Sequence, residues 1–259
     1  MWTRQLLKEN GKIAFKRNYW ICVLVSFIIA LTGGQIGAFS GSSGVKYEQT
    51  TYTEEALFTP EVVEYMVKLI PIVLMAGLLG LIIGIMVAAF VTNIFAIGGN
   101  RYYLENREHK TDVSRVVFGF TNGNYMNCVG IMLRKMLYIL GWTLLFVIPG
   151  IVKSYAYMLI PYILAENPDI SKERAFEISE QTMQGHKWEA FILELSFLGW
   201  DILGIFTGGV LNIFWVMPYK HATYAEFYTA LKAEAFQQGI TSAIELPGVG
   251  YSQEEQVGV

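Results

Sequence analysis

Long apolar runs separated by short charged segments dominate the 259 residues of the chain. A helix needs roughly 20 apolar residues to cross a hydrocarbon core of about 30 Å. Four runs reach that length, namely residues 19–38, 66–99, 128–165 and 188–217. The pattern therefore predicts an all-α, polytopic membrane protein.

The third and fourth runs each contain a turn signal. Pro149-Gly150 divides the third run, because proline lacks a backbone donor and glycine tolerates turn geometry. Thr207-Gly208-Gly209 divides the fourth. Each run therefore predicts a hairpin, which brings the total to six transmembrane helices. The arms of the fourth run are near the lower limit for spanning. One tilted helix over residues 188–217 is thus an alternative, and it would leave the C-terminus outside.

Related residues stand before the first, third and fifth predicted spans. These start motifs are Arg17-Asn18-Tyr19-Trp20, Gly123-Asn124-Tyr125-Met126 and Gly185-His186-Lys187-Trp188. Each follows a segment with helical apolar spacing, which predicts a short amphipathic helix at the cytoplasmic interface. The apolar positions are Trp2, Leu6 and Ile13, then Val113, Val116, Val117 and Phe120, and finally Ala175, Phe176, Ile178 and Met183. We therefore expect three pseudo-repeated hairpins, each preceded by an amphipathic interfacial helix.

The repeat units cover residues of about 1–106, 107–167 and 168–237, which together form a single integral membrane domain. The first unit diverges, because a polar and largely acidic loop over residues 39–65 replaces its tight turn. Basic residues gather in the first 17 positions and between residues 101 and 115. Since cytoplasmic loops carry the excess of Lys and Arg, both termini are expected in the cytoplasm. A disordered cytoplasmic tail is expected over residues 238–259, which lack a periodic apolar face.

A cleaved signal peptide is the alternative for the N-terminal run, which ends in small residues before Ser40. A retained first helix is the better interpretation, because the segment before this run is long and has counterparts later in the chain. Cys22 and Cys128 both lie at the start of an apolar run beside a basic segment. A disulfide between them is not expected on the cytoplasmic side.

Composition excludes two other classes of protein. Apolar residues make up 53% of the chain and charged residues 16%, whereas a soluble protein carries about one charged residue in four. These values exclude a disordered chain and a nucleic-acid-binding protein. The formal net charge of −3 is too small to indicate an electrostatic partner.

Asp201 and Lys153 are the sharpest candidates for a functional site. An ionisable group within a span costs about 2.5–3.5 kcal/mol and is therefore a functional candidate by default. Both residues lie close to the predicted outer turns of their hairpins. They could pair and, with Asn212, line a polar cavity for a small polar or ionic ligand. The structural alternative is that Lys153 extends to the outer interface while Asp201 is hydrated or packs against neighbouring helices.

A second set of charges lies nearer the cytoplasmic ends of the third and fifth spans. Arg134 and Lys135 occupy a depth comparable to that of Glu189 and Glu194. Ion pairs between the hairpins are the first interpretation of this match. Binding of anionic lipid headgroups by the two cations is the second.

No constellation in the sequence indicates catalysis. His109, His186 and His221 lie far apart, without the short spacing of metal ligands. No nucleophile elbow or phosphate-binding glycine loop is recognisable. We therefore expect a protein that is not an enzyme and that uses no cofactor or metal.

Several motifs resemble a known family. They are Ile148-Pro149-Gly150-Ile151-Val152-Lys153-Ser154-Tyr155, Pro161-Tyr162-Ile163-Leu164-Ala165-Glu166-Asn167-Pro168, Gly185-His186-Lys187-Trp188, Leu195-Ser196-Phe197-Leu198-Gly199-Trp200, and Pro218-Tyr219 with Ala222-Thr223-Tyr224-Ala225-Glu226-Phe227-Tyr228. With these motifs the chain resembles the Gram-positive bacterial membrane proteins grouped as domain of unknown function nine-seven-five. The family is also similar to the membrane domain of some glycerophosphodiester phosphodiesterases, but the metal-binding residues of that hydrolase are not seen here. The resemblance implies a bacterial plasma membrane protein and supplies no catalytic residues.

Two functions follow as hypotheses. The first is a non-enzymatic membrane protein that binds or moves a small molecule, lipid or peptide. The alternative is a membrane scaffold or accessory subunit with no ligand path. The expected partners are the lipid bilayer and either anionic lipids or another membrane protein, with no nucleic acid. An enzyme acting on lipid within the membrane comes last, because the candidate acids and bases are few and scattered.

Overall fold

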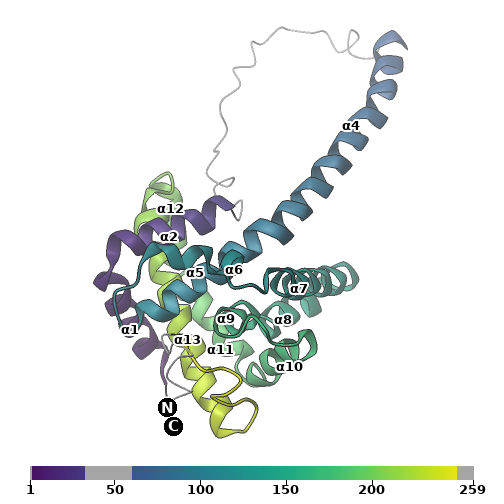
Figure 1. Cartoon of the computed structure of the whole chain (residues 1–259). Coiled ribbons are helices and arrows are strands. Elements are labelled where there is room, and N and C mark those ends of the chain that lie inside the picture. Colours follow the sequence, from purple (N-terminus) through teal and green to yellow (C-terminus); the bar gives the residue numbers. More distant parts are fainter. Residues whose placement is uncertain (1, 33–59, 250–259) are drawn as a thin grey trace.

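A computed structural model describes residues 2–32 and 60–249, and in these two ranges the chain is helical with no strand (Figure 1). The expected all-α class is therefore confirmed. Residues 33–59 lie outside the described residues. They include most of the outer loop that was predicted over residues 39–65. The helices are α1 (Arg4–Arg17), α2 (Tyr19–Thr32), α4 (Pro60–Val87), α5 (Asn93–Asn106), α6 (Phe118–Thr121), α7 (Tyr125–Leu145), α8 (Val147–Ala156), α9 (Ile160–Glu166), α10 (Lys172–Thr182), α11 (Lys187–Leu195), α12 (Leu198–Phe206) and α13 (Met217–Gln237).

Three shorter segments have other helical geometries. The π-helical turns η2 (Ala88–Thr92) and η4 (Asn212–Val216) lead into α5 and α13, and the 3₁₀ helix η3 (Val113–Val117) leads into α6.

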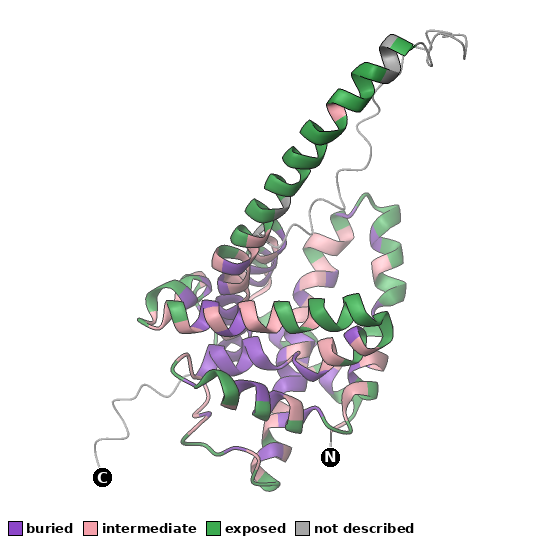
Figure 2. Ribbon diagram, turned by 90° about the vertical axis from the view of Figure 1, so that its right-hand side faces the viewer, coloured by how far each residue is buried: buried purple, intermediate pink, exposed green. Residues whose placement is uncertain are grey.

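The molecule has a packed body and apolar arms. Buried side chains gather in the body around α5, α9, α10 and α13, whereas α4 projects from it and is exposed along its length (Figures 1 and 2). In the most apolar window of residues 64–106 the mean hydropathy is 2.8 and only 6% of the residues are buried. Such a surface is stable when hydrocarbon rather than water covers it.

Three helical stretches are long and apolar enough to cross a membrane: Glu64–Asn106, Tyr125–Leu145 and Val147–Glu166. The number rises to four if α1 and α2, whose axes are bent by 102°, act as one broken span. These stretches fit a polytopic membrane protein but provide fewer than the six predicted spans. The shortfall lies in the fourth apolar run, because α11 and α12 have nine residues each and are only about 14 Å long.

The turn of the third run lies three residues earlier than predicted. Phe146 is extended, with φ −153° and ψ 130°, and α8 already contains Pro149 and Gly150. Proline is tolerated there because the first turn of a helix has backbone donors without intrahelical acceptors. Gly150 does not form the turn. It lets α8 pack closely against α7, because a Cβ atom at this position would lie 2.2 Å from Thr143 Oγ1 on α7.

The fourth run is a hairpin, so the single-helix alternative is wrong. The chain turns after α12 at Gly208 and Gly209, whose φ angles of 59° and 82° favour glycine. Gly204 on α12 then lies against Asn212 on the returning η4, and a Cβ atom on Gly204 would be 1.9 Å from Asn212 Oδ1. Both hairpins therefore have one glycine where their arms touch.

Helices occupy all three segments that were predicted to be amphipathic: α1, η3 with α6, and α10. In α10 the apolar residues Ala175, Phe176 and Ile178 are buried against the body of the protein instead of facing lipid. The interfacial position of this helix stays a prediction. In α1 the apolar side chains divide. Leu7 and Phe15 are buried, whereas Leu6 and Ile13 are exposed.

Three buried glutamates join the segments of the body. Each carboxylate has a cationic partner, which removes most of the cost of burying its charge. The pairs are Glu105 with Arg101 (3.0 Å) and Arg115 (2.8 Å), Glu166 with Lys232 (2.7 Å), and Glu226 with Arg107 (2.8 Å). They connect α5 with η3, α9 with α13, and α13 with the segment after α5.

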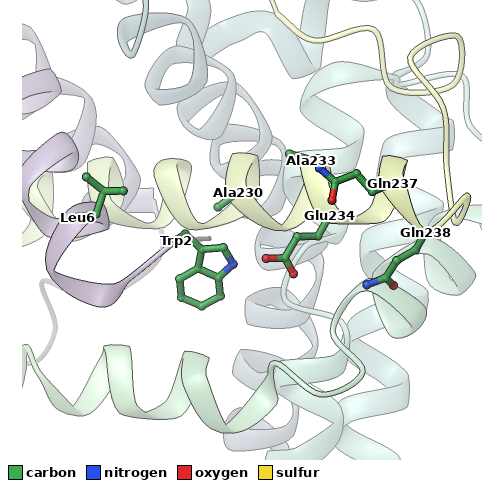
Figure 3. A pocket seen from close by; sticks show the side chains of 7 residues that line it. All are labelled: Trp2, Leu6, Ala230, Ala233, Glu234, Gln237 and Gln238. Carbon is green, nitrogen blue, oxygen red and sulfur yellow. The ribbon is translucent and has the colours of Figure 1, made fainter.

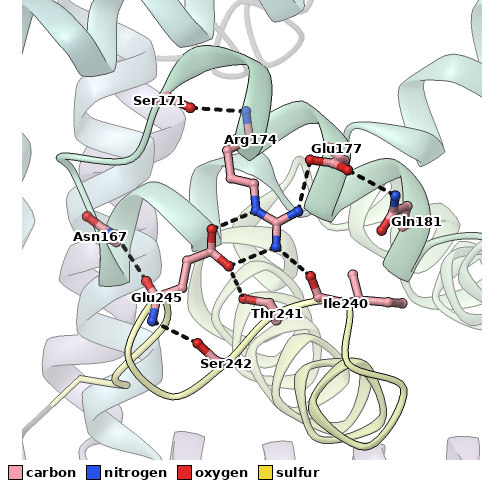
Figure 4. A network of polar contacts seen from close by, with 9 residues as sticks. All are labelled: Asn167, Ser171, Arg174, Glu177, Gln181, Ile240, Thr241, Ser242 and Glu245. Atoms are coloured by element: carbon pink, nitrogen blue, oxygen red, sulfur yellow. Dashed lines mark hydrogen bonds and ion pairs between the residues drawn. The ribbon is translucent and has the colours of Figure 1, made fainter.

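The residues after α13 fold back onto the body, so the predicted disordered tail is wrong for residues 238–249. Arg174 on α10 donates to both oxygens of Glu245 at 2.6 and 3.0 Å and to the Ile240 carbonyl at 2.6 Å (Figure 4). Leu246 and Val249 are buried. Here a bidentate ion pair supplies the order that apolar periodicity does not predict. Residues 250–259 lie outside the described part of the chain.

Gly150→Ala is expected to destabilise the α7–α8 hairpin by about 1–3 kcal/mol, because the added methyl group overlaps Thr143. Gly141→Ala is the matched control. Nothing lies within 4 Å of that position, and alanine favours a helix over glycine by up to about 1 kcal/mol. Thermal unfolding in detergent should show a lower midpoint for the first variant only. Equal midpoints would contradict the close approach.

Glu245→Gln is expected to speed amide hydrogen exchange over residues 240–246, whereas Glu177→Gln, at the more exposed partner of Arg174, should not. The Arg174 hydrogen bond holds the pKa of Glu245 below its ordinary value of 4.5. The stabilisation is therefore present above that value and is lost as the pH falls through the lowered pKa. The difference in unfolding midpoint between wild type and Glu245→Gln should shrink below pH 4.5. A difference that is unchanged by acid would contradict the assignment.

Candidate functional site

Lys153 and Asp201 do not meet, so their predicted pairing is wrong. Lys153 Nζ lies 2.5 Å from Glu180 Oε1, because α8 presents it to α10. Asp201 Oδ2 lies 3.6 Å from Lys220 Nζ on α13. Each charge has a separate partner on a different helix.

Asn212, the third member of the predicted polar site, packs over Gly204. Its Oδ1 atom is buried, and no described residue donates a hydrogen bond to it. It lies at the contact between two arms of one hairpin and lines none of the three cavities described below. The structure therefore disperses the predicted cavity of Lys153, Asp201 and Asn212.

The predicted ion pairs between the third and fifth spans are also absent from the described residues. Arg134 Nη1 instead binds Glu173 Oε1 on α10 at 2.7 Å. Glu189 Oε2 lies 2.7 Å from His186 Nδ1, and Glu194 accepts a hydrogen bond of 2.6 Å from Tyr155 Oη. Of the four predicted residues, Lys135 alone has no oppositely charged partner within ion-pair distance in the described chain. Arg134 and Lys135 therefore differ in role although they are neighbours.

Lys135 and Glu194 line a common cavity of about 410 Å³. Four helices contribute to this polar cavity, namely α7, α8, α11 and α13. Its polar lining consists of Lys135, Ser154, Tyr155, Glu194, Lys220 and Tyr224, and its apolar lining of Ile139, Ile151 and Met158. Sequence positions up to 89 residues apart thus meet at one place.

A second cavity of about 390 Å³ shares Lys135 and Ile139 with the first. This apolar cavity follows one face of α7 over Met132, Lys135, Met136, Ile139, Leu140 and Thr143, with Asn93 of α5 at its side. The hydroxyl of Thr143 donates to the Ile139 carbonyl at 2.7 Å and is satisfied. The lysine therefore lies where a polar cavity adjoins an apolar one.

The polar cavity has an excess of positive charge. Lys220 has two carboxylates nearby, Asp201 at 3.6 Å and Glu194 at 4.0 Å. Lys135 has none among the described residues. Burial raises the pKa of Tyr224, so its hydroxyl stays protonated and can donate a hydrogen bond. An anion is the ligand that an unpaired ammonium group and a free hydroxyl donor fit.

A third cavity, of about 520 Å³, is less suited to a charged ligand. It lies between the N-terminal residues Trp2 and Leu6 and the end of α13, where Glu234 faces it (Figure 3). Glu234 already lies 3.2 Å from His186 Nε2, and the Trp2 ring packs on Phe227 at 5.3 Å. The Glu234 carboxylate therefore has a partner in the protein, whereas the Lys135 ammonium group has none in the described chain. In the described ranges, no group of three or more His, Cys, Asp or Glu residues could hold a metal ion.

The sequence prediction missed three members of the polar cavity: Tyr155, Lys220 and Tyr224. Apolar spacing gives no signal for them. Tyr155 and Tyr224 belong to the motifs that carry the family resemblance, and Lys220 follows the Pro218-Tyr219 motif directly. A lysine so close to the end of an apolar run was a signal that could have been used.

The family comparison covers the helices that line the polar cavity. A model of a family described as protein of unknown function (DUF975) matches residues 21–235. The chain belongs to the DUF975 family. This membership confirms the family resemblance, and every residue that lines the polar cavity lies within the matched region. No curated protein and no solved structure gives a significant match.

The separation of Lys153 from Asp201 can be tested with double-mutant cycles. Lys153→Met and Glu180→Gln are expected to couple by about 0.5–1 kcal/mol in unfolding free energy, because their side chains are in contact and only partly exposed. Lys153→Met and Asp201→Asn should be additive. A coupling confined to the second pair would restore the predicted site and contradict the structure.

Proposed function

We propose that this DUF975 protein is a non-enzymatic membrane protein that binds an anionic ligand in the polar cavity. The observation that carries the proposal is Lys135, a lysine inside an apolar helix that has no carboxylate partner in the described chain. Because Lys135 is only partly exposed, its unpaired ammonium group has lost part of its hydration, and this loss costs free energy. An anion bound in the cavity would offset that cost.

The arrangement of the start motifs supports three repeat units as part of the proposal. Trp20, Met126 and Trp188 occupy the last position of the three motifs and are 72%, 70% and 68% exposed. In each case a helix (α1, α6 or α10) is followed by a turn and then by the helix that bears the exposed residue. Large exposed side chains at the start of an apolar helix suit a membrane–water interface, where tryptophan is enriched.

Orientation follows from the same features. Basic α1 and the basic segment after α5 support a location of these elements on the cytoplasmic side of a bacterial plasma membrane, with both termini there. Three units of one orientation differ from the inverted repeats on which many carriers depend. Binding therefore has more support than transport by alternating access.

A scaffold or accessory subunit is the second candidate, and α4 favours it. Gly77, Gly80 and Gly84 have no other part of the described chain within 4 Å of an added Cβ atom. Small residues let another helix approach closely. In this alternative a partner protein covers α4, and the polar cavity has no ligand.

Binding of dihexanoyl phosphatidylglycerol and dihexanoyl phosphatidylcholine to the detergent-solubilised protein separates the two candidates. The lipids share their chains and differ in headgroup charge. Both headgroups contain a phosphate, but the trimethylammonium group of phosphatidylcholine cancels its charge and is repelled by Lys135 and Lys220. Wild type should therefore prefer the anionic lipid by about 10-fold or more, a difference of about 1.4 kcal/mol. Lys135→Met should abolish the preference, and Glu194→Gln should strengthen it by removing the one carboxylate of the cavity lining.

Arg134→Gln is the matched control, because it removes the neighbouring cation, which faces Glu173 and lies outside the cavity. It should retain the wild-type preference. Equal affinities for the two lipids in wild type, or a preference that survives Lys135→Met, would contradict the binding proposal and favour the scaffold.

A further inference from the structure

Two ion pairs mark the level of the α7–α8 hairpin relative to α10. Arg134 on the first arm binds Glu173, and Lys153 on the second arm binds Glu180. α10 carries five charged residues in its eleven positions, KERAFEISEQT. A helix so charged lies in water or among lipid headgroups. Both arms therefore cross the surface of the membrane near these pairs.

The distance from the pairs to the tip of the hairpin is short. Leu145, the last residue of α7, is eleven residues beyond Arg134, and Val147, the first of α8, is six before Lys153. At a rise of 1.5 Å per residue these lengths are roughly 17 and 9 Å. The hydrocarbon core is about 30 Å thick. The tip at Phe146 therefore reaches only about half-way through it.

Exposure along the hairpin agrees with this depth. Large apolar side chains become exposed beyond the ion pairs, from Leu137 to Val152, and Ile148 at the tip is 76% exposed. The chain then returns to the body, where every residue of α9 is buried. Half of the most apolar window of Val147–Glu166 is buried in the protein. The surface available to lipid is thus confined to the outer part of the hairpin.

The second hairpin is no longer than the first. Asp201 pairs with Lys220, which lines the polar cavity together with Lys135, so the two hairpins share one level. From Asp201 to Phe206, which is 83% exposed, α12 rises only about 8 Å. α4 differs, because its 28 residues extend about 42 Å and can cross the whole core.

We infer that the α7–α8 and α12–η4 hairpins enter one leaflet and end no deeper than about the bilayer centre. Lys135 then lies at the level of the headgroups of that leaflet. Resting on the proposed function, the inference identifies the anion as the headgroup of a membrane lipid. Its acyl chain follows the apolar cavity, whose residues from Lys135 to Thr143 extend about 12 Å along α7 toward the tip.

Cysteine labelling tests the depth. Phe146→Cys and Phe206→Cys, with Leu144→Cys as a second position in the first hairpin, are treated with a membrane-impermeant maleimide in right-side-out and inside-out vesicles. Ser42→Cys in the acidic loop is the control for the outer side, and wild type reports the two buried native cysteines. The tips should react from neither side and become reactive in detergent. Tips that react from the same side as Ser42→Cys would overturn the inference.

A lipid with a photoactivatable acyl chain tests the ligand. Phosphatidylglycerol of this kind should label the α7 peptide containing Met136 and Leu140 in wild type and in Arg134→Gln. Labelling should fall at least 10-fold in Lys135→Met and with the phosphatidylcholine analogue. Equal labelling by both lipids would overturn the lipid assignment. If the tips react from outside while dihexanoyl phosphatidylglycerol still binds in a Lys135-dependent way, the half-depth inference is overturned. The proposed function then remains intact.

Discussion

The burial of three carboxylates is the constraint on which the rest of the structure depends. Glu105, Glu166 and Glu226 lie inside the body, where an unpaired charge would cost several kcal/mol. Each is tolerated because an arginine or lysine from another part of the chain meets it. These pairs are strongly coupled to the fold, since removing one partner leaves a buried charge behind. They therefore specify which segments pack together at the base of the apolar arms.

The same principle makes Lys135 exceptional. Its neighbour Arg134 has Glu173, and Lys220 in the same cavity has Asp201 and Glu194. The body thus satisfies the charges around the cavity with internal partners and leaves one ammonium group at the junction of a polar and an apolar space. A ligand that combines an anionic group with a hydrocarbon chain matches that junction, and the bilayer supplies such molecules at high concentration.

Apolar spacing predicted the helical class and the amphipathic helices, because these depend on local periodicity. The turn signal at Gly208 and Gly209 predicted the hairpin of the fourth run, and sequence motifs carried the family resemblance. None of these features specifies which charged side chains pair. Lys153 and Asp201 lie at similar distances from their turns. The distance along a helix does not specify the direction in which a side chain points, and these two side chains point toward α10 and α13, respectively. Run length predicted six spans, whereas three or four helical stretches of the described residues are long and apolar enough, because α11 and α12 have only nine residues each.

Apolar periodicity also could not predict that residues 238–249 are ordered, because one bidentate ion pair between Arg174 and Glu245 holds them. In the candidate site the sequence identified Lys135 and Glu194, which share the cavity, and missed Lys220, Tyr155 and Tyr224. Those residues come from helices whose contact is fixed only by the folded body.

The most direct test of the account is a cryo-electron microscopy structure of the protein in nanodiscs that contain phosphatidylglycerol. The account predicts Phe146 near the bilayer centre and an elongated density whose head contacts Lys135 and whose tail follows Met136 and Leu140. A Phe146 tip at the outer headgroups, with Lys135 paired to a carboxylate of the protein and no density beside it, would contradict the account.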